Sequence, residues 1–228
     1  LNRLPENERR LLGTYGVIKG ARLFIAGAVT DGPKAMEDFG YAMERNILQA
    51  TALGLGTCWL GGTFRRGGFA AALNLGAGEL LPAITPLGYP GAARSLTDRF
   101  FRFSAGSDQR KEWNVLFTEA GPERPLTRES AGRYATALEC VRKGPSASNK
   151  QPWRIVKYGE AFHFLLARTP GYERMVKEIR LQNLDMGIAL CHFALAAAEL
   201  GLAGRWSVCA PEVPLNGREY IATWTEDG

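Results

Sequence analysis

The segment Gly144-Pro-Ser-Ala-Ser-Asn-Lys-Gln-Pro-Trp153 has the composition of a binding loop. Prolines at both of its ends, Pro145 and Pro152, fix the backbone angle φ at about −65°. Between them, Ser146 and Asn149 carry side chains that stabilise turns and that donate or accept hydrogen bonds. An ordinary connection between a helix and a strand uses the same residue types, so composition alone leaves both interpretations open.

The chain is poorly supplied with residues for acid–base, nucleophilic or zinc chemistry. It has two histidines, His163 and His192, and His192 falls in an apolar helical pattern that is typical of a core residue rather than of a ligand. The cysteines form no CxxC pair: Cys58, Cys140, Cys191 and Cys209. We therefore expect reduced thiols in a cytoplasmic protein, with no metal site and no Ser-His-Asp triad.

Composition and charge favour a globular protein that binds a small molecule. The 228 residues are 46% hydrophobic and 22% charged, and the net charge of +5 comes from scattered Lys and Arg residues. This distribution disfavours nucleic acid as a partner and suits a small anionic ligand. The longest apolar run, 184–204, carries Asp185, His192 and Glu199, which favours a buried helix over a membrane span.

The elements that must position the loop follow from the periodicity of apolar residues. Helices are predicted over 33–55, 128–143 and 184–202, with shorter ones near 69–73 and 111–117. Strands are predicted over 21–29, 80–90, 154–157, 161–167 and 220–224. The segments 58–63 and 204–208, which follow two of the long helices, are interpreted as loops, and 91–124 as irregular.

Two of the long helices share one sequence pattern. Asp-x-Gly-x-Ala-x5-Leu-x-Ala-x2-Leu-Gly-Leu-x3-Trp runs from Asp38 to Trp59 and recurs without a gap, 147 residues later, from Asp185 to Trp206. A strand-like segment precedes each copy. We therefore predict two copies of one unit, residues 1–124 and 125–228, packed through their helices as one compact body that imitates a C2 homodimer.

These segments carry a resemblance to a known family. The loop 144–153, together with Ile47-Leu-Gln-Ala-Thr-Ala-Leu-Gly-Leu-Gly-Thr-Cys-Trp-Leu-Gly-Gly62, resembles the flavin-dependent nitroreductases, in the branch where one chain contains two nitroreductase-like halves. The resemblance covers nearly the whole chain, and Pro-Ser-x-x-Asn-x-Gln-Pro-Trp is its most specific part. It implies an α+β sandwich, with antiparallel-rich sheets around long central helices and FMN at the interface of two pseudo-symmetric halves.

The resemblance also implies which residues would hold FMN. The Pro-Ser-x-x-Asn loop would contact the flavin through Pro145, Ser146, Ala147 and Asn149. The turn after the first helix would offer backbone N–H groups to flavin N5 and O4 from Leu60, Gly61 and Gly62. The basic pair Arg110 and Lys111 would hold the phosphate. Neither a catalytic side chain nor a metal is implied, because the cofactor carries the chemistry.

Two departures from the family pattern concern the number and strength of flavin sites. The family opens with an Arg-Ser-x-Arg-type segment that also holds the phosphate, and residues 1–20 contain no match to it. Either the segment lies upstream of this sequence or this branch lacks it. The second copy of the helix is followed by Gly204-Arg205-Trp206 rather than a Gly-Gly turn. We therefore expect at most one FMN per chain.

The resemblance implies an FMN-dependent oxidoreductase in which NAD(P)H reduces the flavin and a small acceptor, such as a nitroaromatic or a quinone, is then reduced. One alternative is a non-catalytic flavin-binding, or degenerate, protein of the same fold. Another is a different flavin reaction, such as reductive dehalogenation or flavin fragmentation, which would need a lid within 91–124. Neither a nucleic acid nor a membrane is an expected partner, and further homodimerisation of the pseudo-dimeric chain stays open.

Overall fold

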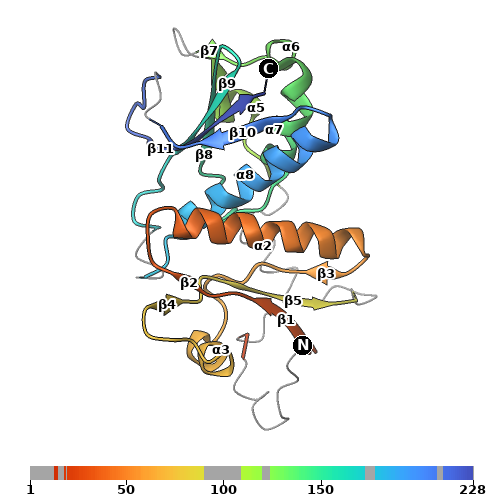
Figure 1. Cartoon of the computed structure of the whole chain (residues 1–228), viewed down its shortest axis with the longest axis vertical. Helices are drawn as coiled ribbons and strands as arrows, with labels where there is room; N and C mark the ends of the chain where they lie inside the picture. The colour runs from red at the N-terminus through yellow and green to blue at the C-terminus, as the bar shows by residue number, and fades with distance from the viewer. Residues whose placement is uncertain are drawn as a thin grey trace.

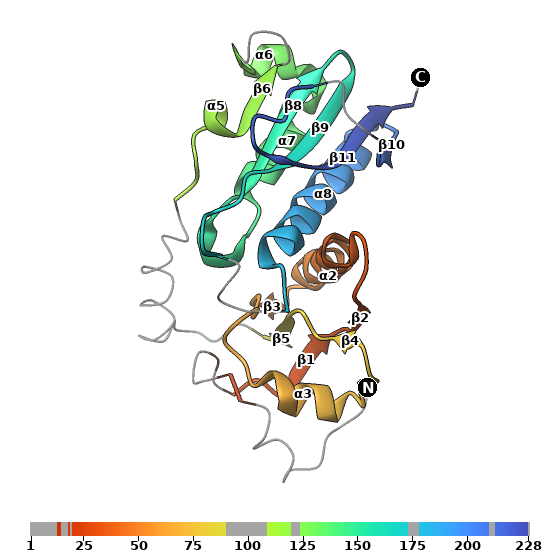
Figure 2. The ribbon, with the colours of Figure 1, turned by 90° about the vertical axis from the view of Figure 1, so that its left-hand side faces the viewer.

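The chain forms two sheets separated by a pair of long helices (Figure 1). The computed structural model describes residues 13–14, 18, 20–89, 109–119, 124–172, 178–209 and 213–227. The helices are α2 (Ala35–Ala52), which lies on the smaller sheet, and α8 (Leu181–Glu199), which lies on the larger one. Seen from the side in Figure 2, the order is larger sheet, α8, α2 and smaller sheet.

The smaller sheet is antiparallel and has side chains packed on both of its faces. Its strands are β1 (Leu23–Ala26), β5 (Ile84–Gly88) and β3 (Gly56–Thr57), in the order β1-β5-β3. A two-stranded ribbon of β2 (Val29–Thr30) and β4 (Glu79–Leu80) lies beside it. Ile25 packs toward α2, whereas Phe24 packs against Phe69 of α3 (Arg66–Ala72). This alternation is what a strand covered on both faces requires.

The larger sheet has the order β10-β11-β9-β8-β6-β7. Its strands are β10 (Gly204–Ser207), β11 (Glu219–Glu226), β9 (Ala161–Leu166), β8 (Trp153–Tyr158), β6 (Phe117–Glu119) and β7 (Arg124–Pro125). All neighbours are antiparallel except β6 and β8. The helical segments beside it are α5 (Trp113–Leu116), α6 (Arg128–Ala131), η1 (Gly132–Tyr134) and α7 (Ala135–Lys143). Phe193 of α8 packs against five aromatic rings there: Tyr134, Phe162, Phe164, Trp206 and Trp224.

The long helices and most strands agree with the sequence predictions, and the differences have local causes. The helix predicted over 128–143 is divided into three pieces, where Gly132 adopts φ of 57°. The strand predicted over 80–90 is divided into β4 and β5, and Pro82, which lacks an N–H, lies between them. The interpretation of 204–208 as a loop is wrong, because Gly204–Ser207 pairs with β11 as an edge strand.

The two long helices cross with their backbones in contact. A Cβ atom added at Gly40 would lie 2.2 Å from the Leu184 carbonyl oxygen, and one at Gly187 would lie 2.0 Å from the Glu37 carbonyl oxygen. Only glycine allows this approach. Under the 147-residue offset of the shared pattern, position 37 corresponds to 184 and position 40 to 187, so the two contacts are reciprocal.

Each long helix also connects strands in the same order. In the smaller sheet, the strand before α2 is β1, the strand after it is β3, and β5 lies between them; β9, β10 and β11 have the same relation to α8. β6 lies before residue 124 but pairs with β8 of the larger sheet. The sheet therefore continues across the boundary that was predicted there.

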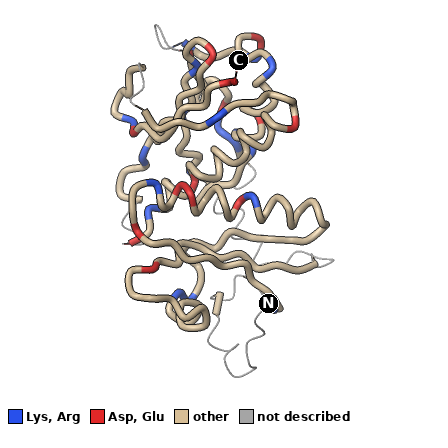
Figure 3. The backbone as a smooth tube through the Cα atoms, viewed as in Figure 1, with Lys and Arg blue, Asp and Glu red and all other residues tan. Residues whose placement is uncertain are grey.

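α8 is a core helix. In the described part of the chain it is the one helix long and apolar enough to cross a membrane, and 67% of its apolar stretch is buried inside the protein. Its neighbours are α2, α7 and strands of the larger sheet. Lys and Arg residues are distributed over both sheets and the helices between them, without forming a stripe among the residues drawn in colour (Figure 3).

We expect Gly187→Ala to lower the free energy of unfolding by about 3 kcal/mol, because the added methyl group collides with rigid backbone. Urea denaturation followed by circular dichroism measures the change. Gly67→Ala in α3 is the matched control: its Cβ meets nothing within 4 Å, and we expect a gain of up to about 1 kcal/mol. Equal stability of Gly187→Ala and the wild type would contradict the close crossing.

Candidate functional site

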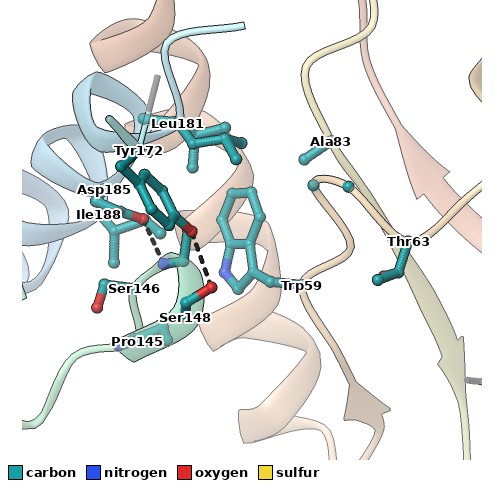
Figure 4. A pocket seen from close by; sticks show the side chains of 14 residues that line it. Trp59, Thr63, Ala83, Pro145, Ser146, Ser148, Tyr172, Leu181, Asp185 and Ile188 are labelled. Atoms are coloured by element: carbon teal, nitrogen blue, oxygen red, sulfur yellow. Dashed lines mark hydrogen bonds between the residues drawn. The ribbon is translucent and has the colours of Figure 1, made fainter. Parts of the chain in front are cut away.

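A cavity of about 330 Å³ lies where the loop after α7 faces the turn after α2 (Figure 4). Its walls come from residues 59–63, residues 145–148 and residues 181–188 of α8, with Ala83 and Tyr172 completing the lining. The volume falls in the range of small-molecule sites. Segments that are far apart in sequence, and that were singled out for their composition, therefore meet around one space.

The loop has a strained backbone that hydrogen bonds hold in place. Ser148, Asn149 and Gln151 adopt φ values of 47°, 51° and 47°, which side-chain-bearing residues rarely adopt. The Gln151 N–H donates to Ser146 Oγ at 2.9 Å, and the Tyr172 hydroxyl donates to Ser148 Oγ at 3.0 Å. Such strain persists only where the surroundings fix it, and it is common at binding sites.

The basic pair lies against the loop, and neither of its residues lines the cavity. Lys111 Nζ donates to the carbonyl oxygens of Lys150 at 2.7 Å and Gln151 at 3.2 Å. Arg110 donates to the Lys143 carbonyl oxygen at 3.1 Å and 3.3 Å. It also donates, at 3.4 Å, to the side-chain oxygen of Asn149. Arg110, Lys111 and Asn149 thus lie together and support the loop.

Lys111 is held among cations. Burial, together with the positive charges of Arg154 and Lys150, lowers the pKa of its ammonium group to about 8. A nearby anion would reverse this effect, because an opposite charge favours the protonated form of lysine.

The turn is fixed by a buried carboxylate between the two helices. Glu44 of α2, which is 1% exposed, accepts a hydrogen bond from Trp59 Nε1 at 2.7 Å through one oxygen. Its other oxygen lies 2.8 Å from His192 Nε2 of α8. The half-buried His192 therefore has a hydrogen-bond partner, as its apolar surroundings predicted. Glu44 joins α2, α8 and the cavity wall in one network.

The glycine turn comes close to α8. A Cβ at Gly61 would lie 2.9 Å from Leu181 Cδ2, so a larger residue would push Leu181 out of place. The carbonyl oxygen of Gly61 accepts a hydrogen bond of 2.6 Å from Arg66. The Leu60 N–H, predicted to face a ligand, donates instead to the Ile84 carbonyl oxygen at 2.9 Å. Leu60 is 2% exposed and lies behind the wall.

Asp185 is a lining residue that sequence reasoning did not select for the site. It is 1% exposed, and its Oδ1 accepts a hydrogen bond of 2.9 Å from the Ala147 N–H. Burial raises the pKa of its carboxyl group to about 8, and the Ala147 hydrogen bond lowers it only in part. An acidic residue in the most apolar helix of the chain was the available signal. Tyr172 was also missed, since nothing in its local sequence marks it.

The predicted site residues thus divide into two groups. Five of them line the cavity: Gly61, Gly62, Pro145, Ser146 and Ala147. Leu60 lies behind the turn, Asn149 lies on the loop outside the cavity, and Arg110 and Lys111 lie against the loop. Their roles toward a ligand remain predictions.

Known proteins resemble this chain in sequence pattern and in fold. Residues 2–197 match a family model described as "Putative TM nitroreductase". A crystal structure described as that of a "putative nitroreductase" from Thermotoga maritima has a TM-score of 0.54 and 20% sequence identity. The match covers 98% of this chain and 85% of that one. A comparison with curated proteins gives no match. At this identity the structural likeness shows a shared fold.

We expect Glu44→Leu to destabilise the protein by about 3 kcal/mol, because Trp59 Nε1 and His192 Nε2 both lose their buried partner. Glu44→Gln should cost less than about 1 kcal/mol, since its amide can accept from Trp59 and donate to a neutral imidazole. Denaturant unfolding and the tryptophan emission maximum measure both effects. A Gln variant as unstable as the Leu variant would show that the charge, rather than the hydrogen bonds, matters.

Proposed function

The chain belongs to the family described as "Putative TM nitroreductase", and from this premise we propose that it is an FMN-dependent oxidoreductase. In this proposal it uses NAD(P)H, in the cytoplasm, to reduce nitroaromatic- or quinone-like acceptors. One observation carries the proposal: residues 145–148, from the loop motif 144–153, and Trp59, Gly61 and Gly62, from the motif 47–62, line a single cavity.

The cavity is suited to a flat ring with polar edges. Its apolar surface comes from Trp59, Ala83 and side chains of α8, which suit an aromatic face. Gly61 and Gly62 let the backbone approach without an intervening Cβ. Asp185 and the two loop serines place polar groups in the same walls. These features fit the isoalloxazine ring of a flavin.

Residues of both segments would hold the cofactor. Pro145, Ser146 and Ala147 would contact the ring from the loop, and the turn would contact it through backbone groups of Gly61 and Gly62. Arg110 and Lys111, with Asn149 beside them, would hold the phosphate, which would relieve the repulsion that Lys111 meets. When bound, FMN would supply the electron transfer between NAD(P)H and the acceptor.

We also propose that the chain arose by duplication, with residues 1–124 and 125–228 as the two halves. The shared helix pattern, the reciprocal glycine contacts and the matching strand order around α2 and α8 support this. In that arrangement the cavity lies between the halves, with the turn from the first and the loop from the second.

A flavin-binding protein without turnover is the second candidate. The sequence features that favour it are the lack, in residues 1–20, of a match to the Arg-Ser-x-Arg-type segment and the lack of a Gly-Gly turn after the second copy of the helix. Both candidates bind the same ring in the same cavity. They differ only in whether the bound flavin can be reduced by a nicotinamide.

Protein incubated with FMN and desalted should retain flavin absorbance, at a stoichiometry near one per chain. Anaerobic mixing with NADH or NADPH should then bleach that absorbance, and a quinone should restore it. Flavin that is retained but never bleached would favour the second candidate. Protein that retains no flavin would refute both.

Lys111→Gln should weaken FMN binding about tenfold, as expected for the loss of one charge-assisted contact to phosphate. Riboflavin, which has no phosphate, should bind the variant and the wild type alike. Lys157→Gln, on strand β8, is the charge-matched control and should leave both affinities unchanged. Fluorescence titration of the wild type and both variants with each ligand gives the six dissociation constants. An equal loss for FMN and riboflavin would show instead that Lys111 acts by supporting the loop.

A further inference from the structure

We propose that Asp185 is a neutral carboxylic acid whose Oδ2–H donates a hydrogen bond to an acceptor atom of the ring bound in the cavity. The ligand class is an uncharged planar ring that presents a carbonyl oxygen or an unprotonated nitrogen at this point. The inference rests on the proposed function only for the choice of FMN as the probe. The role is a binding and selectivity role within the wall of the cavity.

The two oxygens of the Asp185 carboxyl group have different hydrogen-bond surroundings. Oδ1 accepts from the Ala147 N–H at 2.9 Å, the contact drawn as a dashed line in Figure 4. Oδ2 is fully buried and has no partner among the described residues. Asp185 is one of the residues that line the cavity, so its carboxyl group lies in the wall beside the space that a ligand would occupy. A buried polar atom in this situation normally has a partner.

The surroundings favour the neutral form of the acid. None of the described residues that line the cavity is Lys, Arg or His. A buried carboxylate with one neutral hydrogen bond and no cation is costly, and such a group takes up a proton instead. The pKa of about 8, raised by burial, agrees with this. Because Oδ1 accepts from Ala147, the proton belongs on Oδ2, which becomes a donor without a protein acceptor.

Several other ionisable groups of the packed elements have partners of their own. Tyr172, on the loop side of the cavity, donates its hydroxyl hydrogen to Ser148. The Lys150 ammonium lies over the Tyr172 ring, 6.0 Å from its centroid. On α2, Glu37 accepts from Asn183 and lies 3.9 Å from Lys34.

The remaining pair, Glu44 on α2 and His192 on α8, is joined by the hydrogen bond described above. None of these groups forms a hydrogen bond or an ion pair with Asp185. Burial raises the pKa of Tyr172, and the Asp185 charge contributes in the same direction.

The internal repeat supplies a matched control. Asp38 occupies the equivalent position of α2, but it is exposed and does not line the cavity. Asp185→Asn is the informative substitution, because the Ala147 N–H selects the amide oxygen as its acceptor and so places the amide NH2 where Oδ2 lies. The Asn variant therefore imitates the protonated acid and does not titrate. Asp185→Leu removes the donor altogether.

Affinity for FMN is measured by flavin fluorescence at pH 6.5 and pH 9.5 for the wild type and for Asp185→Asn, Asp185→Leu and Asp38→Asn. Above a pKa of about 8 the donor is lost, so wild-type affinity should fall at least tenfold at the higher pH, relative to Asp185→Asn. Dividing the wild-type affinity by that of Asp185→Asn at the same pH removes the effect of the ionisation of FMN itself, which is the same for both proteins. Asp38→Asn should follow the wild type. Asp185→Leu should bind weakly at both values.

A wild type and an Asn variant with the same affinity ratio at both pH values would overturn the proposal. So would a Leu variant that binds as well as the wild type at pH 6.5. Failure of every protein to bind FMN would refute the proposed function. The protonation of Asp185 would then be tested by spectra and thermal unfolding of the ligand-free protein.

Infrared difference spectra between the ligand-free wild type and Asp185→Asn should show a protonated carboxyl band at pH 6.5 that disappears by pH 9.5. Absence of the band at pH 6.5 overturns the proposal.

Thermal unfolding gives an independent check. The folded-state pKa lies above the unfolded value, so the wild type loses stability as pH rises through 8. The midpoint of Asp185→Asn should therefore rise relative to the wild type from pH 6.5 to 9.5, and a constant difference would contradict the proposal.

Discussion

The contact between the backbones of α2 and α8 is the constraint on which the rest of the structure depends. Gly40 and Gly187 let each helix touch the carbonyl oxygen of the other at positions that correspond in the repeated pattern. Because the helices cross so closely, the turn that follows α2 and the loop that follows α7 both lie beside the first turns of α8. The turn after α2, the loop after α7 and the first turns of α8 then enclose the cavity. A wider crossing would separate these walls.

Three buried acidic residues surround this crossing, and their hydrogen bonds divide them by role. Glu37 accepts from Asn183, and Glu44 accepts from Trp59 and contacts His192, so both connect elements within the protein. Asp185 receives one hydrogen bond, from the loop, and its second oxygen has no partner among the described residues. The first two are adequately explained by structure. The third lines a cavity and has hydrogen-bonding capacity that the described residues do not use.

The sequence was sufficient for features set by local pattern. Apolar periodicity predicted α2 and α8, and the unusual loop 144–153 and the Gly61-Gly62 turn were recognised as site components from composition and family resemblance. It could not predict the short strands β3, β6, β7 and β10, because pairing with distant strands stabilises them. The backbone hydrogen bond from the Leu60 N–H to the Ile84 carbonyl oxygen is likewise a contact with a distant strand. Asp185 became recognisable only when its burial and its contact with Ala147 were known. Residues 91–108 and 120–123, within the segment that was predicted to be irregular and in which the alternative flavin reactions would need a lid, lie outside the described residues.

The central claim is that the cavity between the turn, the loop and α8 is a flavin site. A crystal structure of the protein grown with FMN tests it most directly. The account predicts electron density for the isoalloxazine ring between Gly61-Gly62 and residues 145–148, with a ring acceptor within hydrogen-bonding distance of Asp185 Oδ2 and the phosphate near Arg110 and Lys111. Density for FMN elsewhere on the chain, with the cavity empty, would contradict it.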